Sequence, residues 1–586
     1  MEHKIQNEQE MMMRHGMSHV LAKAICSMYP DVKLSIGPAI DTGFYYDIDC
    51  PKSITPEDFE AIEKKMSEII SQNQDFVRKE VSKAEALKMF KDNPYKVELI
   101  EGLADDEVIS VYYLGDDWVD LCRGPHVENT KYLRGFAFKI DKVAGAYWRG
   151  DEKNKMLQRI YCFGFAKKED LKEHLRLVQE AKERDHRKLG KDLGIFMFSD
   201  LVGRGLPMWL PNGFLLRHAL SEYIMNKELS LGYKHVMTPS LGNINLYKTS
   251  GHWDHYKDDM FPAMQLDDEE GYVLRPMNCP HHMVMFKNSM HSYRDLPLRI
   301  AEIANDFRFE DSGALCGIER TRAFTQNDSH IFCTPEQIEQ EVKGVIDLIL
   351  DVYKDFGFKN YSFRLSLRDK NNVEKYFGND ELWEKSEKAL RQILKNSGAE
   401  YYEAEGEAAF YGPKIDVQVF SALGHEVTLS TVQLDYQLPE RFELEYTDEN
   451  DNKVRPVVIH RAILGSLDRF VAFLLEETKG NLPTWLCPVQ VHVMNIADVH
   501  LSYAKSVAEK LEQAGVRVFV DSRNESIGKK IREAQLAKIP YMLIVGDKEV
   551  EAGAVAVRKR GLGDQGAVKV EEFIKSIAAE IANKSL

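Results

Sequence analysis

The sequence has 586 residues, 44% of them apolar, which supplies core material for about three or four domains. A net charge of −16 argues against a general polyanion-binding protein, and eight cysteines without a C-x-x-C pair favour a reduced, cytoplasmic enzyme over a disulfide-linked secreted protein. The charged N-terminus predicts no signal peptide, and no apolar run approaches the ~20 residues that a membrane helix needs.

The first segment, residues 1–165, mixes predicted helices and strands. Thr55-Pro56-Glu57-Asp58 combines an N-cap residue, a first-turn proline and an acidic first turn, which predicts a helix start. From Phe59 to Ile69 apolar residues recur at helical spacing and predict one buried helix face.

Four possible metal ligands lie in this first segment. His15 and His19 are spaced i, i+4, so a helix puts both on one face. Cys122 and His126 follow later, in Asp120-Leu-Cys-Arg-Gly-Pro-His126. On spacing alone the four residues resemble a zinc site, and a pair of surface histidines is the alternative.

Residues 166–191 are highly charged. Leu171, Leu175 and Val178 fall on a single side, which predicts one long connecting helix. This helix marks a domain boundary.

The middle of the chain, residues 192–482, predicts a largely antiparallel sheet. Three segments alternate as half-buried strands do: Phe363–Leu367, Ile415–Phe420 and Glu426–Ser430. Short turns between such strands are typical of antiparallel pairing. The apolar stretch His460–Phe470 is expected to be helical.

Three metal-type residues of the middle segment lie far apart in the chain: Cys279, His330 and His460. One thiolate and two imidazoles leave a zinc ion a fourth position for water or substrate, as in reactive zinc sites. A lone buried Cys or His is more often a core residue, so the sequence spacing by itself does not establish this site.

Arginines near these residues suit phosphate binding. Arg308 and Glu310 are followed by a Gly-containing loop that ends at Arg320, and Arg469 lies near the end of the segment. Guanidinium groups bind phosphate oxygens and stabilise the charge that gathers during phosphoryl transfer. A surface ion pair is the alternative for any one of them.

The C-terminal segment, residues 485–586, predicts a separate α/β domain. Its strands and helices alternate as βαβαβ, through Val489–Val493, a helix from Leu501 that ends before Gly515, Val516–Val520, a second helix, and Tyr541–Val545. From Asp521 to Arg560 there are nine Lys/Arg against six Asp/Glu, and this local positive balance in an acidic chain indicates a confined nucleic-acid contact.

Motif by motif, the chain resembles the class II aminoacyl-tRNA synthetases, and most closely the threonyl-tRNA synthetases. Leu206–Phe214 through Thr238-Pro239 resembles the first class II motif, a dimer-forming helix and strand that end in proline. Phe307–Glu310 resembles the second motif and Gly465–Arg469 the third. The resemblance covers nearly the whole chain.

The resemblance implies an α/β multidomain (α+β) fold with an antiparallel sheet core rather than a Rossmann fold. It implies an α+β editing domain in residues 1–165, a linker helix in 166–191, a catalytic domain in 192–482 and an α/β anticodon-binding domain in 485–586. It also implies a homodimer. Many family members begin with a small ubiquitin-like domain, whereas this sequence starts directly at the editing segment.

The resemblance assigns roles around ATP. Arg308 would hold the α-phosphate, Glu310 would help to position ATP, and Phe324 would stack on adenine. Arg469 would reach the γ-phosphate, with Arg320 as a further phosphate contact. Mg²⁺ would bridge phosphate oxygens.

The resemblance also implies a zinc ion held by Cys279, His330 and His460. Threonine and valine are nearly isosteric, and an apolar pocket separates such isosteres by only ~10²-fold. An open zinc position binds an amino group and a hydroxyl together, which valine does not offer. The residues implied beside the amino acid are Met277, Gln326, Asp328, Tyr411 and Gln433. Thr428 departs from the glutamine found in relatives.

Serine carries both polar groups and lacks only one methyl, so a separate hydrolytic check is expected. The first segment resembles the editing domain shared by threonyl and alanyl synthetases. The residues implied to activate water there are His15, His19, Lys96, Asp120, Cys122 and His126. Whether a metal also binds there is left open.

The C-terminal segment resembles the anticodon-binding domain of the same family, and Asn524, Glu549 and Arg558 take the positions implied to read anticodon bases. Ser526 stands where relatives carry lysine. The expected function is therefore ATP-dependent charging of tRNA with threonine and hydrolysis of seryl-tRNA. A stand-alone aminoacyl-tRNA hydrolase, a non-catalytic RNA-binding regulator, and a ligase for proline or serine are the alternatives.

Overall fold

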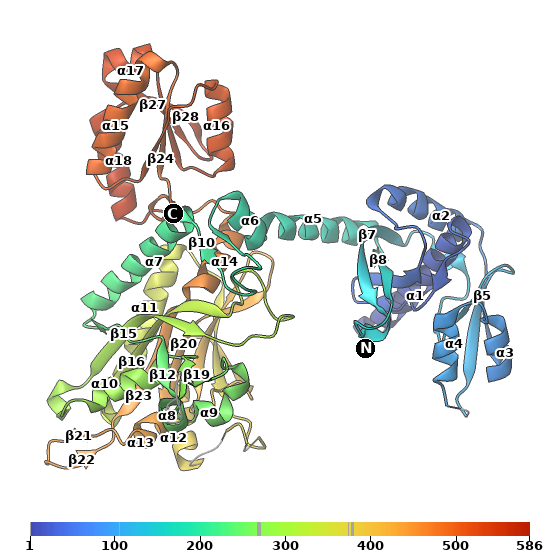
Figure 1. The fold of residues 1–586 in the computed structure, drawn as a ribbon, viewed down its shortest axis with the longest axis horizontal. Helices are drawn as coiled ribbons and strands as arrows, with labels where there is room; N and C mark the ends of the chain where they lie inside the picture. The colour runs from blue at the N-terminus through green and yellow to red at the C-terminus, as the bar shows by residue number, and fades with distance from the viewer. Residues whose placement is uncertain (1, 105, 266–270, 373, 377–379) are drawn as a thin grey trace. The chain divides into compact units, whose positions relative to one another are not determined.

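The computed structural model describes residues 2–104, 106–265, 271–372, 374–376 and 380–586. The chain divides into two compact units, Met1–Gln179 and Glu180–Leu586 (Figure 1). Among the described residues, no helix combines the length and the apolar character needed to cross a membrane. All eight cysteines are free, as the sequence predicts.

The first unit contains two antiparallel sheets. The larger has the order β1-β3-β8-β7 with β2 paired to β3, and the smaller has the order β4-β5-β6. The strands are β1 (Lys33–Leu34), β2 (Ala39–Ile40), β3 (Gly43–Asp49), β4 (Phe76–Val81), β5 (Ile109–Leu114), β6 (Val119–Leu121), β7 (Ala137–Tyr147) and β8 (Met156–Phe165).

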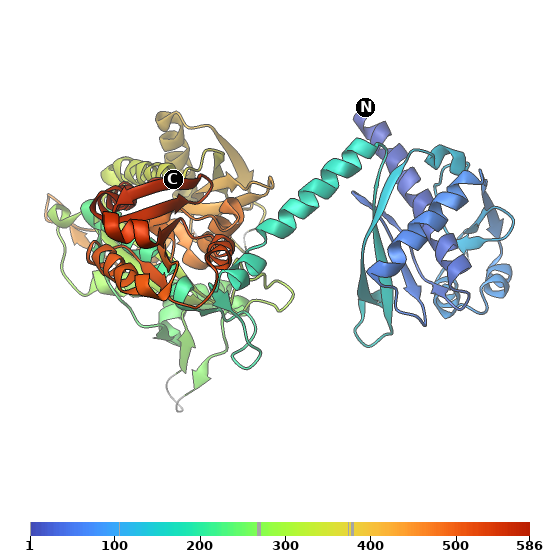
Figure 2. The ribbon, with the colours of Figure 1, turned by 90° about the horizontal axis from the view of Figure 1, so that it is seen from above.

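Helices α1 (Glu2–Met28) and α2 (Phe59–Ser71) pack on the larger sheet (Figures 1 and 2). Helices α3 (Lys83–Met89) and α4 (Pro94–Glu101) share a smaller core with β5. The predicted helix start is confirmed, because the carboxylate of Asp58 accepts from the backbone N–H of Thr55 at 2.9 Å. The predicted apolar face of α2 is buried.

The connecting segment is two helices, α5 (Lys168–Arg184) and α6 (His186–Asp192). The expectation of one continuous helix over 166–191 is wrong at Asp185, whose ψ of 113° leaves the helical region. The side chain of Asp185 accepts from the backbone N–H of Arg187 at 2.8 Å and starts α6 as its N-cap. Aspartate competes in this way with helix continuation.

The second unit is built on an eight-stranded sheet with the order β11-β15-β16-β23-β20-β19-β17-β18. Its strands are β11 (Lys234–His235), β15 (Leu298–Phe307), β16 (Ala323–Cys333), β17 (Tyr361–Leu367), β18 (Tyr401–Glu405), β19 (Lys414–Phe420), β20 (Glu426–Asp435) and β23 (Val457–Ser466). Only the β11–β15 and β17–β18 pairs are parallel. The predicted antiparallel sheet and its three strand segments are confirmed.

Helices α7 (Pro211–Ser230), α11 (Ile338–Phe356), α12 (Asp380–Ser397) and α14 (Leu467–Thr478) share one hydrophobic core with one face of this sheet. Alternation along the strands decides which side chains face these helices. Ile331 and Ile459 belong to the core. The residues next to them in the same strands, His330 and His460, face the opposite side of the sheet. That opposite side is available for a functional site.

The stretch His460–Phe470 is not one helix. Residues up to Ser466 belong to strand β23, and α14 begins only at Leu467. An apolar run that is buried on both faces of a sheet carries no period-2 signal, so hydrophobicity alone does not distinguish it from a buried helix. The side chain of Ser466 caps α14 by accepting from the N–H of Arg469 at 3.3 Å.

Shorter elements surround the sheet. They are β9 (Phe196–Met197), β10 (Met208–Trp209), β12 (Leu241–Asn243), α8 (Ile244–Ser250), α9 (His252–His255), β13 (Met264–Gln265), β14 (Gly271–Leu274), α10 (Cys279–Lys287), α13 (Gln437–Arg441), β21 (Tyr446–Thr447) and β22 (Lys453–Val454). Helices α10 and α13 share a second core with the ends of the sheet strands.

The C-terminal part has its own five-stranded sheet, in the order β25-β24-β26-β27-β28. Its elements are β24 (Val491–Asn495), α15 (Leu501–Gln513), β25 (Val518–Asp521), α16 (Ile527–Leu536), β26 (Tyr541–Val545), α17 (Asp547–Ala552), β27 (Ala554–Lys559), β28 (Gly563–Lys569) and α18 (Val570–Ala582). The first three strands are parallel, which confirms the predicted βαβαβ unit. Helices α15 and α18 cover one face and α16 the other (Figure 1).

A buried ion pair attaches helix α7 to the sheet. Arg461 of β23 lies 2.6 Å from the carboxylate of Glu228 in α7, and both side chains are 0% exposed. The same carboxylate accepts from the amide of Asn327 at 2.9 Å. Removing one partner of such a pair leaves an uncompensated buried charge.

We therefore expect Arg461→Met to destabilise the second unit by about 3–5 kcal/mol. Calorimetry of the full chain measures this as a lower unfolding temperature. Lys343→Met is the matched control, because Lys343 pairs with Asp347 while both are about 60% exposed. Equal shifts for the two variants would contradict this role of the pair.

Candidate functional site

The open face of the large sheet carries most of the predicted site residues in rows. His330 in β16 lies opposite His460 in β23, which lies opposite Gln433 in β20. In the next row Asp328 lies opposite Glu302 in β15. Residues opposite one another in neighbouring strands share a face, so strand register fixes these side chains side by side.

This face lines a cavity of about 420 Å³. All thirteen residues predicted for ATP, zinc and amino acid line it: Met277, Cys279, Arg308, Glu310, Arg320, Phe324, Gln326, Asp328, His330, Tyr411, Gln433, His460 and Arg469. The structure therefore brings together four stretches that are separate in the sequence, 277–279, 308–330, 411–433 and 460–469. Thr428 also lines the cavity, and its hydroxyl donates to Gln418 at 2.8 Å.

Three arginines converge at one end of the cavity. The guanidinium of Arg308 lies 5.0 Å from the ring centroid of Phe324, and Arg469 donates to the backbone oxygen of Glu319 at 3.3 Å. Arg320 pairs with Glu310 at 2.8 Å. Burial lowers the pKa of Arg469 from its ordinary value. An anion entering here meets crowded positive charge, which favours a polyphosphate.

Cys279, His330 and His460 form a possible metal site. Their ligand atoms lie within 4.8 Å of one another, and all three residues are buried. His460 Nε2 lies 2.8 Å from Asp435 Oδ2, which leaves Nδ1 as the nitrogen for a metal. His330 Nε2 is buried and, within the described part of the chain, has no hydrogen-bond partner. One thiol, two imidazoles and a carboxylate behind one imidazole fit a reactive zinc site.

Residues that could contact an amino acid lie next to Cys279, His330 and His460. Asp328 Oδ2 lies 3.7 Å from His330 Nε2, and the hydroxyl of Tyr411 donates to Gln433 at 2.7 Å. Burial, reinforced by the neighbouring carboxyl of Asp306, raises the pKa of Asp328 well above its usual range. The cavity thus offers polar groups that match an amino group and a hydroxyl beside the metal position.

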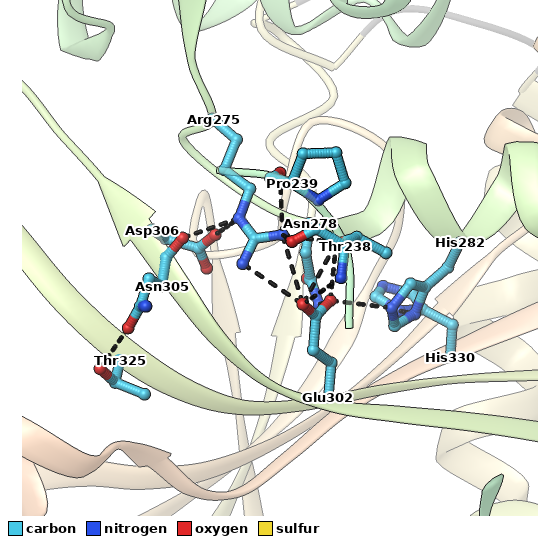
Figure 3. Close-up of polar contacts among 10 residues, drawn as sticks. All are labelled: Thr238, Pro239, Arg275, Asn278, His282, Glu302, Asn305, Asp306, Thr325 and His330. Carbon is cyan, nitrogen blue, oxygen red and sulfur yellow. Dashed lines mark hydrogen bonds and ion pairs between the residues drawn. The ribbon is translucent and has the colours of Figure 1, made fainter. Parts of the chain in front are cut away.

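Sequence reasoning missed the polar residues behind the metal group. His282, Glu302 and Arg275 form a buried network that ends at His330 (Figure 3). His252 is also buried, with Nε2 3.7 Å from the sulfur of Cys279. The local signals are a second histidine one turn after Cys279 and a glutamate inside an apolar strand, neither of which is specific by itself.

The first unit brings its predicted cluster together as well. Cys122 Sγ lies 3.3 Å from Nε2 of His15 and 3.2 Å from Nε2 of His126. The ligand atoms of these residues and His19 lie within 4.8 Å of one another. His15 and His19 come from α1, and Cys122 and His126 from the loop that follows β6.

A buried ion pair supports this cluster. Lys96 Nζ lies 2.6 Å from Asp120 Oδ1, with side chains 3% and 2% exposed. The hydroxyl of Tyr46, which the sequence did not indicate, donates to Asp120. His19 Nε2 lies 4.0 Å from the same carboxylate. Lys96 and Asp120 therefore bring fixed, opposite charges to the imidazole cluster.

Burial sets the protonation states of this cluster. It raises the pKa of the Cys122 thiol to about 11 and lowers the pKa of His15 below its usual value. Burial and the neighbouring imidazoles lower the pKa of His19 and of His126. Neutral imidazoles near pH 7 can accept a proton from water, which suits hydrolysis.

The three predicted tRNA contacts do not lie at one place. Asn524 follows β25 and Glu549 follows β26, so both lie at the C-terminal edge of the parallel strands. Arg558 pairs with Met542, one residue from the opposite end of β26. The carboxylate of Glu549 accepts from the N–H of Gly546 at 2.9 Å and caps its own helix.

Ser526 has a local structural role. Its hydroxyl oxygen accepts from the backbone N–H of Lys529 at 3.4 Å and caps α16. Serine is a preferred N-cap residue, so this position stabilises the helix.

Three family models match the chain. A tRNA synthetase class II core domain (G, H, P, S and T) matches residues 261–478, and an anticodon binding domain matches residues 490–580. A threonyl and alanyl tRNA synthetase second additional domain matches residues 109–161.

Similar proteins cover the chain more fully. The threonine–tRNA ligase of Anoxybacillus flavithermus is 56% identical over 572 residues, which is 97% of this chain and 88% of that protein. The threonine–tRNA ligase of Staphylococcus carnosus is 55% identical over 98% of this chain and 88% of that protein. The RNA binding domain of threonyl-tRNA synthetase from Cryptosporidium parvum has a TM-score of 0.65 at 40% identity, over 68% of this chain and 98% of that chain.

Proposed function

Because the chain belongs to the threonine–tRNA ligase family of class II aminoacyl-tRNA ligases, we propose that Cys279, His330 and His460 hold a zinc ion that selects threonine. The chain is an ATP-dependent enzyme that charges tRNA with threonine, and Mg²⁺ accompanies ATP. The observation that supports zinc is a buried set of one thiol and two imidazoles, in which His330 Nε2 has no hydrogen-bond partner among the described residues.

Adenylation needs positioning more than covalent chemistry. The carboxylate of threonine attacks the α-phosphorus of ATP and pyrophosphate leaves. A terminal ribose hydroxyl of tRNA then attacks the adenylate carbonyl, and AMP leaves. In our proposal Arg308 binds the α-phosphate, Arg469 the γ-phosphate, and Phe324 stacks on adenine. Glu310 and Arg320, paired at 2.8 Å, help to hold ATP once it enters. Fixed guanidiniums stabilise the charge that develops in transfer.

Selection of threonine over valine depends on polar groups. Zinc held by Cys279, His330 and His460 would offer coordination to both the amino group and the hydroxyl of threonine. Asp328 accepts from the same hydroxyl, while Gln326, Tyr411 and Gln433 surround the amino acid and Met277 forms an apolar wall. Valine leaves these buried polar groups unpaired, which costs far more than a change of shape.

Activation of serine is the error that this selection leaves, since the missing methyl changes the binding free energy by only about 1–3 kcal/mol. We propose that the cluster of the first unit hydrolyses mischarged seryl-tRNA. A neutral imidazole of His15, His19 or His126 takes the proton of the attacking water and delivers it to the ribose oxygen as the seryl ester bond breaks. The buried Lys96–Asp120 pair orients His19 and balances developing charge. The match to the second additional domain supports this proposal.

The remaining assignments concern partners. We propose that Asn524, Glu549 and Arg558 contact the anticodon of the threonine tRNA. We also propose a homodimer formed through the segment that contains α7, because Phe214 is 63% and Met237 is 93% exposed there. Exposed large apolar side chains on one segment are typical of an interface. A cytoplasmic location stays a prediction.

The decisive experiment is metal analysis of the purified protein together with amino-acid-dependent pyrophosphate exchange. We expect one zinc per chain, and exchange with threonine and serine at rates at least about 10²-fold above those with valine and proline. A metal-free protein that still prefers threonine to valine would refute the zinc assignment.

Arg308→Ala should lower the rate of adenylate formation by about 10²- to 10³-fold, because the α-phosphate loses the fixed positive charge of the guanidinium. Hydrolysis of supplied seryl-tRNA should continue at the normal rate, since that reaction is assigned to the first unit. Arg294→Ala, which removes an exposed arginine of the second unit, is the control. Loss of both reactions in Arg308→Ala would contradict two separate sites.

Cys122→Ala should leave threonine charging intact and allow seryl-tRNA to accumulate. The thiol contacts two imidazoles, so its loss disturbs their placement. Charging with serine in the presence of ATP measures the product, and Cys50→Ala is a matched control in the same unit. Seryl-tRNA that fails to accumulate in Cys122→Ala would argue against the editing assignment.

A further inference from the structure

Two hydrogen bonds in series connect His330 with two residues that are not predicted metal ligands, His282 and Glu302 (Figure 3). His282 Nδ1 lies 2.8 Å from His330 Nδ1, and His282 Nε2 lies 3.2 Å from Glu302 Oε2. His282 is 0% exposed, as is His330, and Glu302 is 2% exposed. Solvent therefore does not share these contacts.

The carboxylate of Glu302 determines which atom donates and which accepts in each of these two hydrogen bonds. An ionised carboxylate only accepts, so His282 Nε2 carries the proton that it donates to Glu302. A neutral His282 then has a lone pair on Nδ1 and accepts from His330. The proton of His330 consequently lies on Nδ1, and its Nε2 carries the lone pair.

The geometry points to Glu302 and His282 as positioning residues that hold His330 in the tautomer whose Nε2 lone pair faces Cys279 and His460. This inference rests on the proposed zinc site. It accounts for the buried Nε2 of His330, which has no hydrogen-bond partner in the part of the chain that the structure describes. A metal is the partner that this lone pair fits.

The surroundings of Glu302 keep it an acceptor. Its carboxylate accepts from the N–H of Thr238 at 2.9 Å, from Asn278 at 3.2 Å and from Arg275 at 3.4 Å. Figure 3 shows it between Arg275 on one side and His282 on the other. Although burial opposes the charge, the hydrogen bond from His282, the hydrogen bonds from Thr238 and the charge of Arg275 lower the pKa of Glu302 to about 2. Glu302, the first residue of this hydrogen-bonded series, is therefore a fixed anion.

Strand register explains why two residues are needed. The residue of β15 opposite His330 is Ile300, whereas Glu302 lies opposite Asp328. Glu302 thus lies one row away from His330, and His282 bridges the rows. His282 comes three residues after Cys279 in α10, so one helical turn supplies both a proposed ligand and the bridge.

His460 offers a contrast on the same site. Its Nε2 contacts Asp435 at 2.8 Å, so Nδ1 is its nitrogen for the metal. The two imidazoles therefore present different nitrogens, each set by a carboxylate behind it. His460 reaches its carboxylate directly, and His330 reaches its own through His282.

The test compares three variants of the full-length protein. His282→Leu removes both contacts, His282→Asn keeps an amide oxygen near the position of Nδ1, and His281→Leu changes the neighbouring residue as a matched control. Zinc affinity is measured by competition with a chromophoric chelator. The visible absorption of the Co²⁺-substituted protein reports on ligand geometry, which a general loss of stability does not mimic.

We expect His282→Leu to bind zinc about 10- to 100-fold more weakly, with a changed Co²⁺ spectrum. His282→Asn should recover most of the affinity, and His281→Leu should match the wild type. Unchanged affinity and spectrum in His282→Leu, or an equal loss in His281→Leu, would overturn the positioning role while leaving the zinc site standing. A wild-type protein that binds no zinc would overturn both.

Discussion

The register of β16 against its two neighbours is the constraint on which the cavity of the large sheet depends. It sets His330 opposite His460 and Asp328 opposite Glu302. A shift by one residue would turn every one of these side chains into the hydrophobic core, because strand side chains alternate with a period of two. The helices on the other face prevent such a shift, because Ile331 and its partner across the strands, Ile459, are buried beneath them.

This constraint carries a cost in buried charge, which the structure meets with partners from outside the sheet. Glu228 of α7 neutralises Arg461 on the helix side, and Arg275 neutralises Glu302 on the cavity side. Both pairs are almost completely buried. Each pair joins a strand of the sheet to a segment outside it, so the same contacts that satisfy charge also fix the cavity walls.

The sequence predicts the motif residues and much of the fold. It does not predict the buried polar residues that hold the motif residues in place. Alternation predicts three strands of the antiparallel sheet. The apolar run from His460 shows no alternation and predicts a helix, although His460–Ser466 belongs to strand β23. Asp185 broke the connecting helix through a local cap that charge patterning does not reveal. His282 and Glu302 act through contacts between distant segments, so nothing near them in the chain indicates their partners.

The two units use the same side-chain types in different electrostatic settings. In the first unit the sulfur of Cys122 contacts Nε2 of both His15 and His126, so thiol and imidazoles already satisfy one another, and Lys96 supplies a fixed cation close by. In the second unit His330 Nε2 has no such partner among the described residues. The nitrogen of His330 without a hydrogen-bond partner fits the proposed metal, while the imidazoles of the first unit, already in contact with a thiol, suit the proposed proton transfer.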